Sequence, residues 1–193
     1  KKKLMLQIII ASFIVSFIFI TSTSTIELEL MIPFLKNFTL YLGIFFIPWS
    51  ILVIIGSSNA VNLTDGLDGL AILPCILIAA AFVLFAYVEG NFNIANYLLI
   101  PYLSGVSEIA IFSSTIVGAG LGFLWYNSYP AEVFMGDVGS LSLGAVLAAI
   151  AILLRLEIIY AIMGGVFIAE ALSVIIQVTS FKLFGKRVFK MSP

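Results

Sequence analysis

The sequence has no histidine, a single cysteine and no glycine-rich phosphate loop. Without histidine, these residues cannot form a His-based zinc site, or a Ser-His or Cys-His nucleophilic pair. The one cysteine, Cys75, cannot form an intramolecular disulfide and lies in an apolar run, so we interpret it as a small apolar filler. Because the pattern GxxxxGK[ST] is missing, we expect any phosphate to be held by a metal rather than by a nest of backbone amides.

Charge is scarce and nearly balanced, with 9 basic and 10 acidic residues and a net charge of −1. This argues against nucleic acid as a partner, because neutralising phosphates requires clustered Lys and Arg. Apolar residues, in contrast, are in excess: they make up 62% of the 193 residues. A soluble domain has roughly 45–50%. The composition is therefore that of a membrane protein.

The apolar residues fall into long runs, and a membrane span needs about 20 of them. In lipid such runs have to be helical, because the backbone must satisfy its own hydrogen bonds. The sequence predicts an all-α integral membrane protein, a polytopic bundle of about six transmembrane helices. We expect a single domain over residues 1–193, because no linker divides the chain. The predicted spans are residues 4–22, 41–60, 69–88, 109–127, 139–154 and 158–181.

The basic residues are unevenly distributed between the two sides of the predicted bundle. Six spans place both chain ends on one side, and only Lys36 and Arg155 fall on the other. By the positive-inside rule, the side of the chain ends is cytoplasmic, and the segments near 59–68 and 128–138 face the cytoplasm. Residues 26–30, on the outward side, alternate in polarity and predict a short strand or an interfacial segment. The basic residues on the cytoplasmic side are Lys1, Lys2, Lys3, Lys182, Lys186, Arg187 and Lys190.

Two short segments concentrate polar residues against this apolar background. "NLTDGLDGLA" and "FMGDVGSLSLGA" each place an aspartate beside glycine, directly before an apolar run. One interpretation is that Asp65 and Asp137 are helix N-caps. Capping does not account for Asp68 or Asn62, however. The other interpretation is a site at the cytoplasmic helix ends, where carboxylates and neutral oxygens without His or Cys suit Mg²⁺ shared with a phosphate-bearing substrate.

Further polar and aromatic residues extend the set of candidates. Phe134 lies in a polar segment three residues before Asp137, where it could stack on a planar base. Glu170, Ser173 and Gln177 share one face of the last predicted span. A mid-membrane Glu is a functional candidate, or it bonds a neighbouring helix. An ion-coupled membrane transporter is the alternative function, with a site near the membrane midplane, and a structural membrane subunit is a third possibility.

Four segments together carry a family resemblance that runs from about residue 56 to the end: "NAVNLTDGLDGLA", "GAGLGFLWYNSYPAEVFMGDVGSLSLGA", "IMGGVFIAEALSVIIQV" and "FKLFGKRVFKMSP". They resemble the phospho-N-acetylmuramoyl-pentapeptide transferase family, within the polyprenyl-phosphate phosphosugar transferase superfamily. The resemblance implies Mg²⁺-dependent transfer from UDP-N-acetylmuramoyl-pentapeptide to undecaprenyl phosphate, forming lipid I and UMP for peptidoglycan. It also implies a homodimer in the lipid bilayer of the bacterial cytoplasmic (inner) membrane, with its active site facing the cytoplasm.

The resemblance also implies roles for individual residues. Asp137 would bind Mg²⁺, and Asp65, Asp68 and Asp137 would be catalytic. The family's adjacent pair of aspartates and its histidine-rich loop do not occur in these residues. We therefore expect the chain to correspond to the central and later part of an enzyme of about ten helices, and to be inactive alone. The residues implied to contact the nucleotide are Asn62, Leu63, Gly66, Asp68, Asn127, Phe134 and Gln177.

Overall fold

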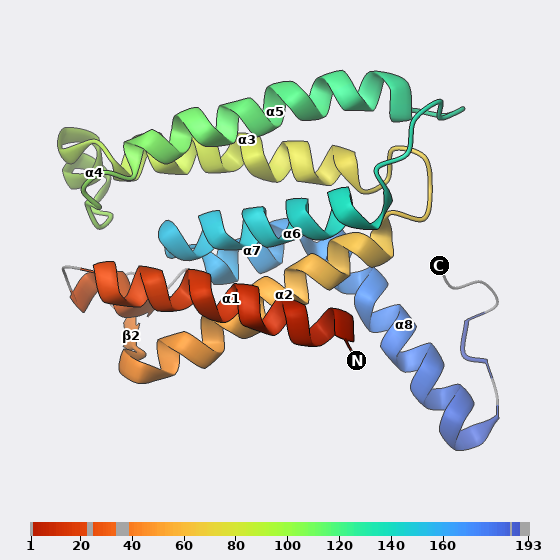
Figure 1. The fold of residues 1–193 in the computed structure, drawn as a ribbon. Coiled ribbons are helices and arrows are strands. Elements are labelled where there is room, and N and C mark those ends of the chain that lie inside the picture. The colour runs from red at the N-terminus through yellow and green to blue at the C-terminus, as the bar shows by residue number, and fades with distance from the viewer. Residues whose placement is uncertain (1, 23–24, 34–38, 186, 190–193) are drawn as a thin grey trace.

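The computed structural model describes residues 2–22, 25–33, 39–185 and 187–189. Within them lie eight α-helices and one two-stranded sheet (Figure 1). Six helical segments are long and apolar enough to cross a membrane, which confirms the predicted all-α polytopic class. The helices are α1 (Lys2–Thr21), α2 (Phe46–Thr64), α3 (Ile72–Glu89), α4 (Phe92–Leu98), α5 (Ser107–Asn127), α6 (Gly136–Leu153), α7 (Glu157–Met163) and α8 (Gly165–Phe184).

The long helices pack in pairs around an apolar core. Helix α3 lies against α5, α2 lies against α6, and α1 and α8 each contact α2. Val61, Phe82 and Leu147 are fully buried between them. Large apolar side chains such as Phe13 and Ile20 are instead exposed on the outside. An apolar exterior of this kind suits helices surrounded by lipid.

Helices α2 and α6 approach closely because Gly144 has no side chain. A Cβ atom at this position would lie 2.8 Å from the Ser57 carbonyl oxygen and 2.9 Å from the Cα of Ser58. Two hydroxyls cross the same interface: Ser57 Oγ donates to the Gly144 carbonyl at 2.6 Å, and Ser58 Oγ donates to the Leu141 carbonyl at 2.8 Å. Small residues and hydroxyls are typical of helix contacts in membranes. This contact sets how the ends of α2 and α6 lie relative to each other.

We expect Gly144→Ala to lower the free energy of unfolding by about 1–3 kcal/mol, because the added methyl forces two backbones apart. Thermal unfolding in detergent measures this. Gly118→Ala is the matched control, since a Cβ atom there, also in a helix, meets nothing within 4 Å. Equal stability of the two variants would contradict the close approach of α2 and α6.

The sixth predicted span, residues 158–181, was wrong as a single helix. The structure divides it at Gly164 into α7 and α8, and α8 leans away from the other helices (Figure 1). Gly164 and Gly165 are adjacent, and glycine pairs are a usual cause of helix breaks because they restrain the backbone least. The break gives α8 a direction that a continuous span would not have.

The end of the bundle away from the start of α1 carries strands β1 (Glu29–Met31) and β2 (Thr39–Tyr41), and we call it the hairpin end. The strands are antiparallel and pair Leu30 with Leu40. Residues 26–30 were predicted as a short strand or an interfacial segment; only Glu29 and Leu30 of them lie in a strand, because residues 25–28 form a 3-10 helix. Arg155 is buried at this end and donates to the backbone carbonyl of Glu29 from Nε, at 2.9 Å, and from Nη2.

Candidate functional site

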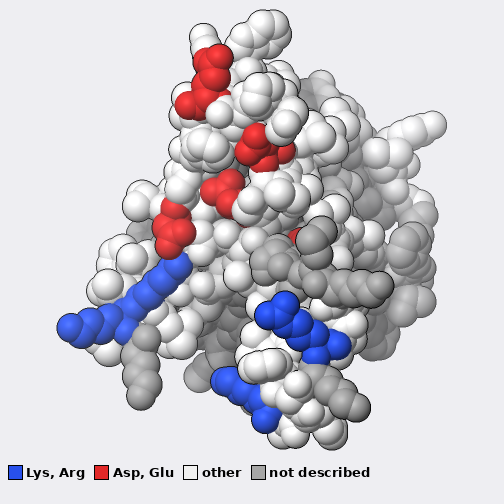
Figure 2. Space-filling view, turned by 90° about the vertical axis from the view of Figure 1, so that its right-hand side faces the viewer, with Lys and Arg blue, Asp and Glu red and all other residues white. Residues whose placement is uncertain are grey.

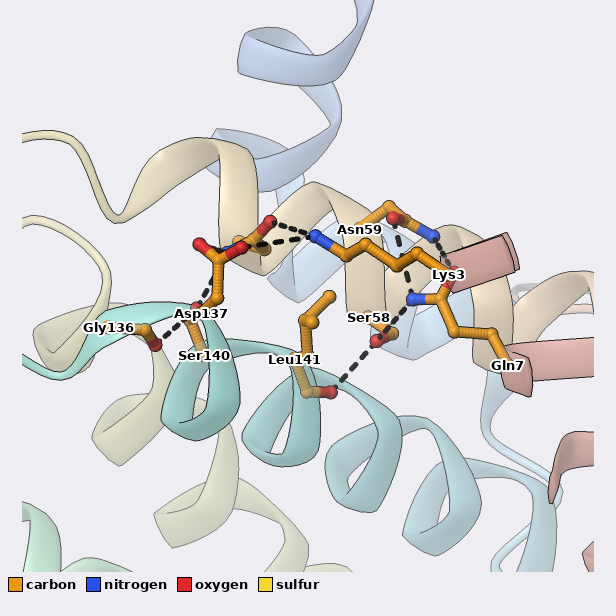
Figure 3. A network of polar contacts seen from close by, with 9 residues as sticks. Lys3, Gln7, Ser58, Asn59, Gly136, Asp137, Ser140 and Leu141 are labelled. Atoms are coloured by element: carbon orange, nitrogen blue, oxygen red, sulfur yellow. Dashed lines mark hydrogen bonds and ion pairs between the residues drawn. The ribbon is translucent and has the colours of Figure 1, made fainter. Parts of the chain in front are cut away.

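Asp137 lies in the first turn of α6, where side chains from α1 and α2 reach it (Figure 3). Asn62 Nδ2 donates to Asp137 Oδ1 at 3.1 Å and to Ser140 Oγ at 2.9 Å. Lys3 Nζ donates to Asp137 Oδ2 at 3.4 Å and to Asn62 Oδ1 at 3.2 Å. Three helices thus converge on one carboxylate, and we call this end of the bundle the site end.

A second layer of polar contacts lies one helical turn away (Figure 3). Gln7 Nε2 donates to Ser58 Oγ at 3.4 Å and to Asn59 Oδ1 at 3.5 Å. Asn59 Nδ2 in turn donates to Gln7 Oε1 at 3.3 Å. These bonds connect α1 to α2. They hold the start of α1, and with it Lys3, beside the site.

The capping interpretation of the two glycine-flanked aspartates is wrong. The N-cap of α6 is Met135, and Asp137 instead contacts Lys3 and Asn62. Asp65 follows the last residue of α2 as its C-cap, while the N-cap of α3 is Ala71. The side chain of Asp137 is 76% exposed. Its carboxylate is therefore open to a ligand.

Asp65 is the second acidic group that faces this region. It is half-buried, and burial together with the charge of Asp137 raises the pKa of the Asp65 carboxyl above its usual range. Two carboxylates that repel each other are both stabilised by a cation placed near them. The electrostatics of the site end therefore favour cation binding.

Asp68 and Asn127 join the segment 65–71 to the segment 128–135. Asp68 Oδ2 accepts a hydrogen bond from the Ala131 backbone N–H at 3.0 Å. Asn127 is buried, its Nδ2 donates to the Val133 carbonyl at 2.8 Å, and its Oδ1 accepts from the Gly69 N–H at 3.1 Å. In this structure both side chains position the loops. Their contact with a nucleotide stays a prediction.

Three other predicted nucleotide contacts are exposed at the site end. Leu63 is 41% exposed in the last turn of α2, and Phe134 is 72% exposed just before α6. Gly66 faces open space, because a Cβ atom there would meet nothing within 4 Å. A ligand can reach all three, and their contact with a nucleotide stays a prediction.

Gln177 is not brought into the Asp137 network. In the part of the chain that the structure describes, its Oε1 accepts from the backbone N–H groups of Val188 and Phe189, both at 3.0 Å. Glu170 is half-exposed on the same helix, and Ser173 Oγ donates to its backbone carbonyl at 2.8 Å. Helix α8 therefore contributes no side chain to the described contacts of Asp137, and the role of Gln177 stays a prediction.

Sequence reasoning missed Lys3 and Gln7 as members of the site. Lys3 entered the prediction only through the positive-inside rule, because no motif around Lys3 marks this lysine as a ligand. The available signal was weak: a lysine and a glutamine four residues apart lie on one helical face at the polar end of a span. The contact itself joins residues 134 positions apart in the chain.

The charges at the site end are separated (Figure 2). Carboxylates gather on one side of this face and basic side chains on the other, and they meet where Lys3 pairs with Asp137 at 3.4 Å. Lys182 lies in the last turn of α8 and Arg187 beyond its end, and both side chains are exposed. A face with this pattern can bind a metal on one side and phosphate oxygens on the other.

The donor groups suit a metal that is shared with a substrate. Among the described residues, no group of three or more Asp, Glu, Cys or His side chains is placed to hold a metal ion. Asp137 instead supplies one exposed carboxylate, and the Asn62 amide oxygen lies beside it, 3.2 Å from the same Lys3 ammonium that contacts Asp137 Oδ2. Mg²⁺ is usually held by one or two carboxylates, with water and phosphates completing its coordination. These residues therefore fit a Mg²⁺ ion that arrives with a phosphate ligand.

Comparison with known families adds an independent finding. The sequence model of the family described as Glycosyl transferase family 4 matches residues 1–155 of the chain. The matched range includes Lys3, Asn62, Asp65 and Asp137, and it ends between α6 and α7.

Proposed function

The chain belongs to glycosyl transferase family 4 and is therefore a phosphosugar transferase that acts on polyprenyl phosphate; within that family, we propose that it transfers phospho-N-acetylmuramoyl-pentapeptide from its UDP carrier to undecaprenyl phosphate. The products are lipid I and UMP. The substrate assignment rests on the four sequence segments named above. The proposal includes a Mg²⁺ requirement, a homodimer, and a location in the bacterial inner membrane with the site end facing the cytoplasm.

The observation that carries the proposal is the convergence of Lys3, Asn62 and Asp137 at the end of an apolar bundle. The carboxylate can bind the metal ion that accompanies a diphosphate substrate, and the amide and ammonium groups can donate hydrogen bonds to its phosphate oxygens. The position also matters: these groups lie at helix ends, whereas an ion-coupled transporter is expected to bind near the midplane. The geometry thus favours the transferase over that alternative.

In the proposed reaction, an oxygen of the lipid phosphate forms a bond to the β-phosphorus of the UDP-linked substrate, and the bond to the bridging oxygen breaks to release UMP. Bound Mg²⁺ would offset the negative charge of the diphosphate as it develops on the leaving group. Asp137 would hold the metal through its exposed carboxylate. Lys3, which contacts the same carboxylate at 3.4 Å, would attract phosphate oxygens. The chemistry is therefore mainly positioning and charge stabilisation.

An apolar cavity supports a lipid acceptor. It has a volume of about 560 Å³ and lies between α2 and the two helices α7 and α8. Leu52, Gly56 and Ala60 line it from α2, and Ile168 and Leu172 line it from α8. Ala60 is two residues before Asn62. A polyprenyl chain in this groove would bring its terminal phosphate toward the site end.

Phe134→Ala tests the predicted contact with the base. We expect it to weaken binding of UDP by about 1–3 kcal/mol, because an exposed aromatic ring that stacks on a base contributes that much. Isothermal titration with UDP and Mg²⁺ measures the loss. Tyr129→Ala is the control, since Tyr129 is an 88% exposed aromatic side chain of the same segment. If both variants bind UDP like the parent, Phe134 does not stack on the uracil.

The proposed activity is tested by UMP release in detergent with Mg²⁺, undecaprenyl phosphate and UDP-N-acetylmuramoyl-pentapeptide. The assay uses this chain and a version extended at both ends. Release by the extended protein alone would support a site to which further segments contribute. Release from UDP-N-acetylglucosamine but not from the muramoyl substrate would keep the family and overturn the finer assignment. No release from either substrate would overturn the proposal.

A further inference from the structure

We propose that Lys3 and the divalent cation compete for Asp137, so that the metal binds weakly alone and tightly when a phosphate ligand accepts the displaced lysine. This inference rests on the proposed function, because it takes Asp137 as the metal ligand. It adds a role for Lys3: a built-in counter-cation that couples metal binding to phosphate binding.

The contacts of Asp137 carry the first step. Both of its carboxylate oxygens already have a partner: Oδ1 accepts from the Asn62 amide at 3.1 Å, and Oδ2 accepts from the Lys3 ammonium at 3.4 Å. Lys3 Nζ also lies 3.2 Å from Asn62 Oδ1 (Figure 3). The ammonium thus contacts two of the oxygens that a hard cation would use. A cation that binds Asp137 must therefore displace one of these partners or share the negative charge of the carboxylate with the ammonium.

The ammonium is the partner that can leave. Lys3 is about half exposed, with 49% of its side chain accessible, and its charge sits on a flexible four-carbon stem. Asn62 is held from two sides, since its Nδ2 also donates to Ser140 Oγ. Moving Lys3 therefore costs less than moving Asn62. The exchange needs rotation of one side chain only.

The displaced ammonium has a destination when phosphate is present. A phosphate oxygen is a strong acceptor for lysine, and a diphosphate also supplies ligands to the metal. Metal and phosphate would therefore bind with positive coupling, because each would raise the affinity of the site for the other. The acceptor oxygen belongs either to the nucleotide diphosphate or to the polyprenyl phosphate, and the two arms of the test distinguish these sources.

The first measurement is Mn²⁺ binding, followed by electron paramagnetic resonance of free Mn²⁺, on the full-length protein in detergent without nucleotide. We expect Lys3→Met to bind Mn²⁺ about two- to fivefold more tightly, the effect of removing one exposed ion-pair partner. The gain should shrink at high salt because the competition is Coulombic. Lys2→Met, which removes an exposed neighbouring lysine, should bind Mn²⁺ like the parent.

The second measurement adds a phosphate ligand. With Mn²⁺ present, Lys3→Met should bind UDP severalfold more weakly, opposite in sign to its effect on Mn²⁺ alone. A lysine that only packs α1 against the bundle would weaken both. If UDP affinity is unchanged and the KM for undecaprenyl phosphate rises instead, the lipid phosphate is the acceptor of the ammonium. If neither changes, the coupling is overturned.

The outcomes separate this inference from the proposed function. Suppose that Lys3→Met and the parent bind Mn²⁺ equally well, and that adding Asp137→Asn abolishes binding in both. This result overturns the competition but leaves Asp137 as the metal ligand. Mn²⁺ binding that Asp137→Asn does not affect overturns the metal assignment itself, and the competition with it.

Discussion

Replacing Asp137 with asparagine should lower Mg²⁺-dependent turnover by about 10²–10³-fold, because a metal ion supplies several kcal/mol of charge stabilisation to a transferring phosphate. A neutral amide is a poor ligand for a hard cation. Asparagine has nearly the same shape as aspartate and can still accept a hydrogen bond from Asn62 or Lys3. The variant should therefore fold, and the loss should reflect charge rather than structure. The measurement is UMP release by the full-length enzyme over a range of Mg²⁺ concentrations.

Glu132→Gln is the matched control, because Glu132 is an exposed acid of the neighbouring segment 128–135. It removes the same charge from the same end of the molecule, so long-range electrostatics change in both variants. We expect its turnover and Mg²⁺ dependence to stay near those of the parent. Parent-like turnover of Asp137→Asn would refute the metal role of Asp137.

Arg155→Met should destabilise the fold by about 3–5 kcal/mol, because it removes the buried guanidinium that donates to the Glu29 carbonyl and pairs with the Glu29 carboxylate. Arg155 is 2% exposed and lies 4.0 Å from Glu29 Oε2. Burial lowers the pKa of its guanidinium, and the charges of Glu29, Glu157 and Glu89 oppose that shift. Both Glu89 and Glu157 are 4% exposed. Arg155 therefore pairs with Glu29 at the hairpin end, while burial raises the pKa of Glu157 to about 7.

The backbone of Arg155 and the polar groups around it also adopt an unfavourable arrangement. Its backbone has φ of 58°, in the left-handed region that disfavours side chains with a Cβ. Among the described residues, Arg155 Nη1, Glu89 Oε2 and Glu157 Oε2 are buried without a hydrogen-bond partner. Strain and unpartnered groups persist only where the surrounding packing holds them. Arg155 therefore fastens the hairpin to the turn between α6 and α7.

Thermal unfolding in detergent measures the effect of Arg155→Met, with Arg187→Met as the control because Arg187 is exposed beyond α8. The protein that remains folded should keep the Mg²⁺ dependence of the parent, because Arg155 lies at the hairpin end. Stability equal to that of Arg187→Met would contradict the role of Arg155.

The predicted spans agree with the helices because span length and apolarity are local properties. Residues 69–88 were predicted and α3 covers Ile72–Glu89; residues 109–127 were predicted and α5 covers Ser107–Asn127. The break at Gly164 was missed, because a window long enough to detect a span averages over two glycines. Whether adjacent glycines end a helix depends on what packs around them.

The site was partly predictable for the same reason. Asn62 and Asp137 were expected near each other, since both fall at the same end of apolar spans, and the structure joins them at 3.1 Å. The partners of Asn127 were not predictable: its type indicates hydrogen bonding, but only the folded loops decide that it bonds Gly69 and Val133. Lys3 was missed because no local pattern connects it to a residue 134 positions away.

By itself, the sequence determined the membrane class, the number of long apolar helices and the end at which polar residues gather, because hydropathy along the chain controls each of these. Only the tertiary structure decided which polar groups meet. The pairing of Lys3 with Asp137, the burial of Arg155 among carboxylates and the direction of α8 all depend on contacts between distant segments. Such contacts are set by helix packing, for which a close approach at Gly144 matters more than any pattern near the site.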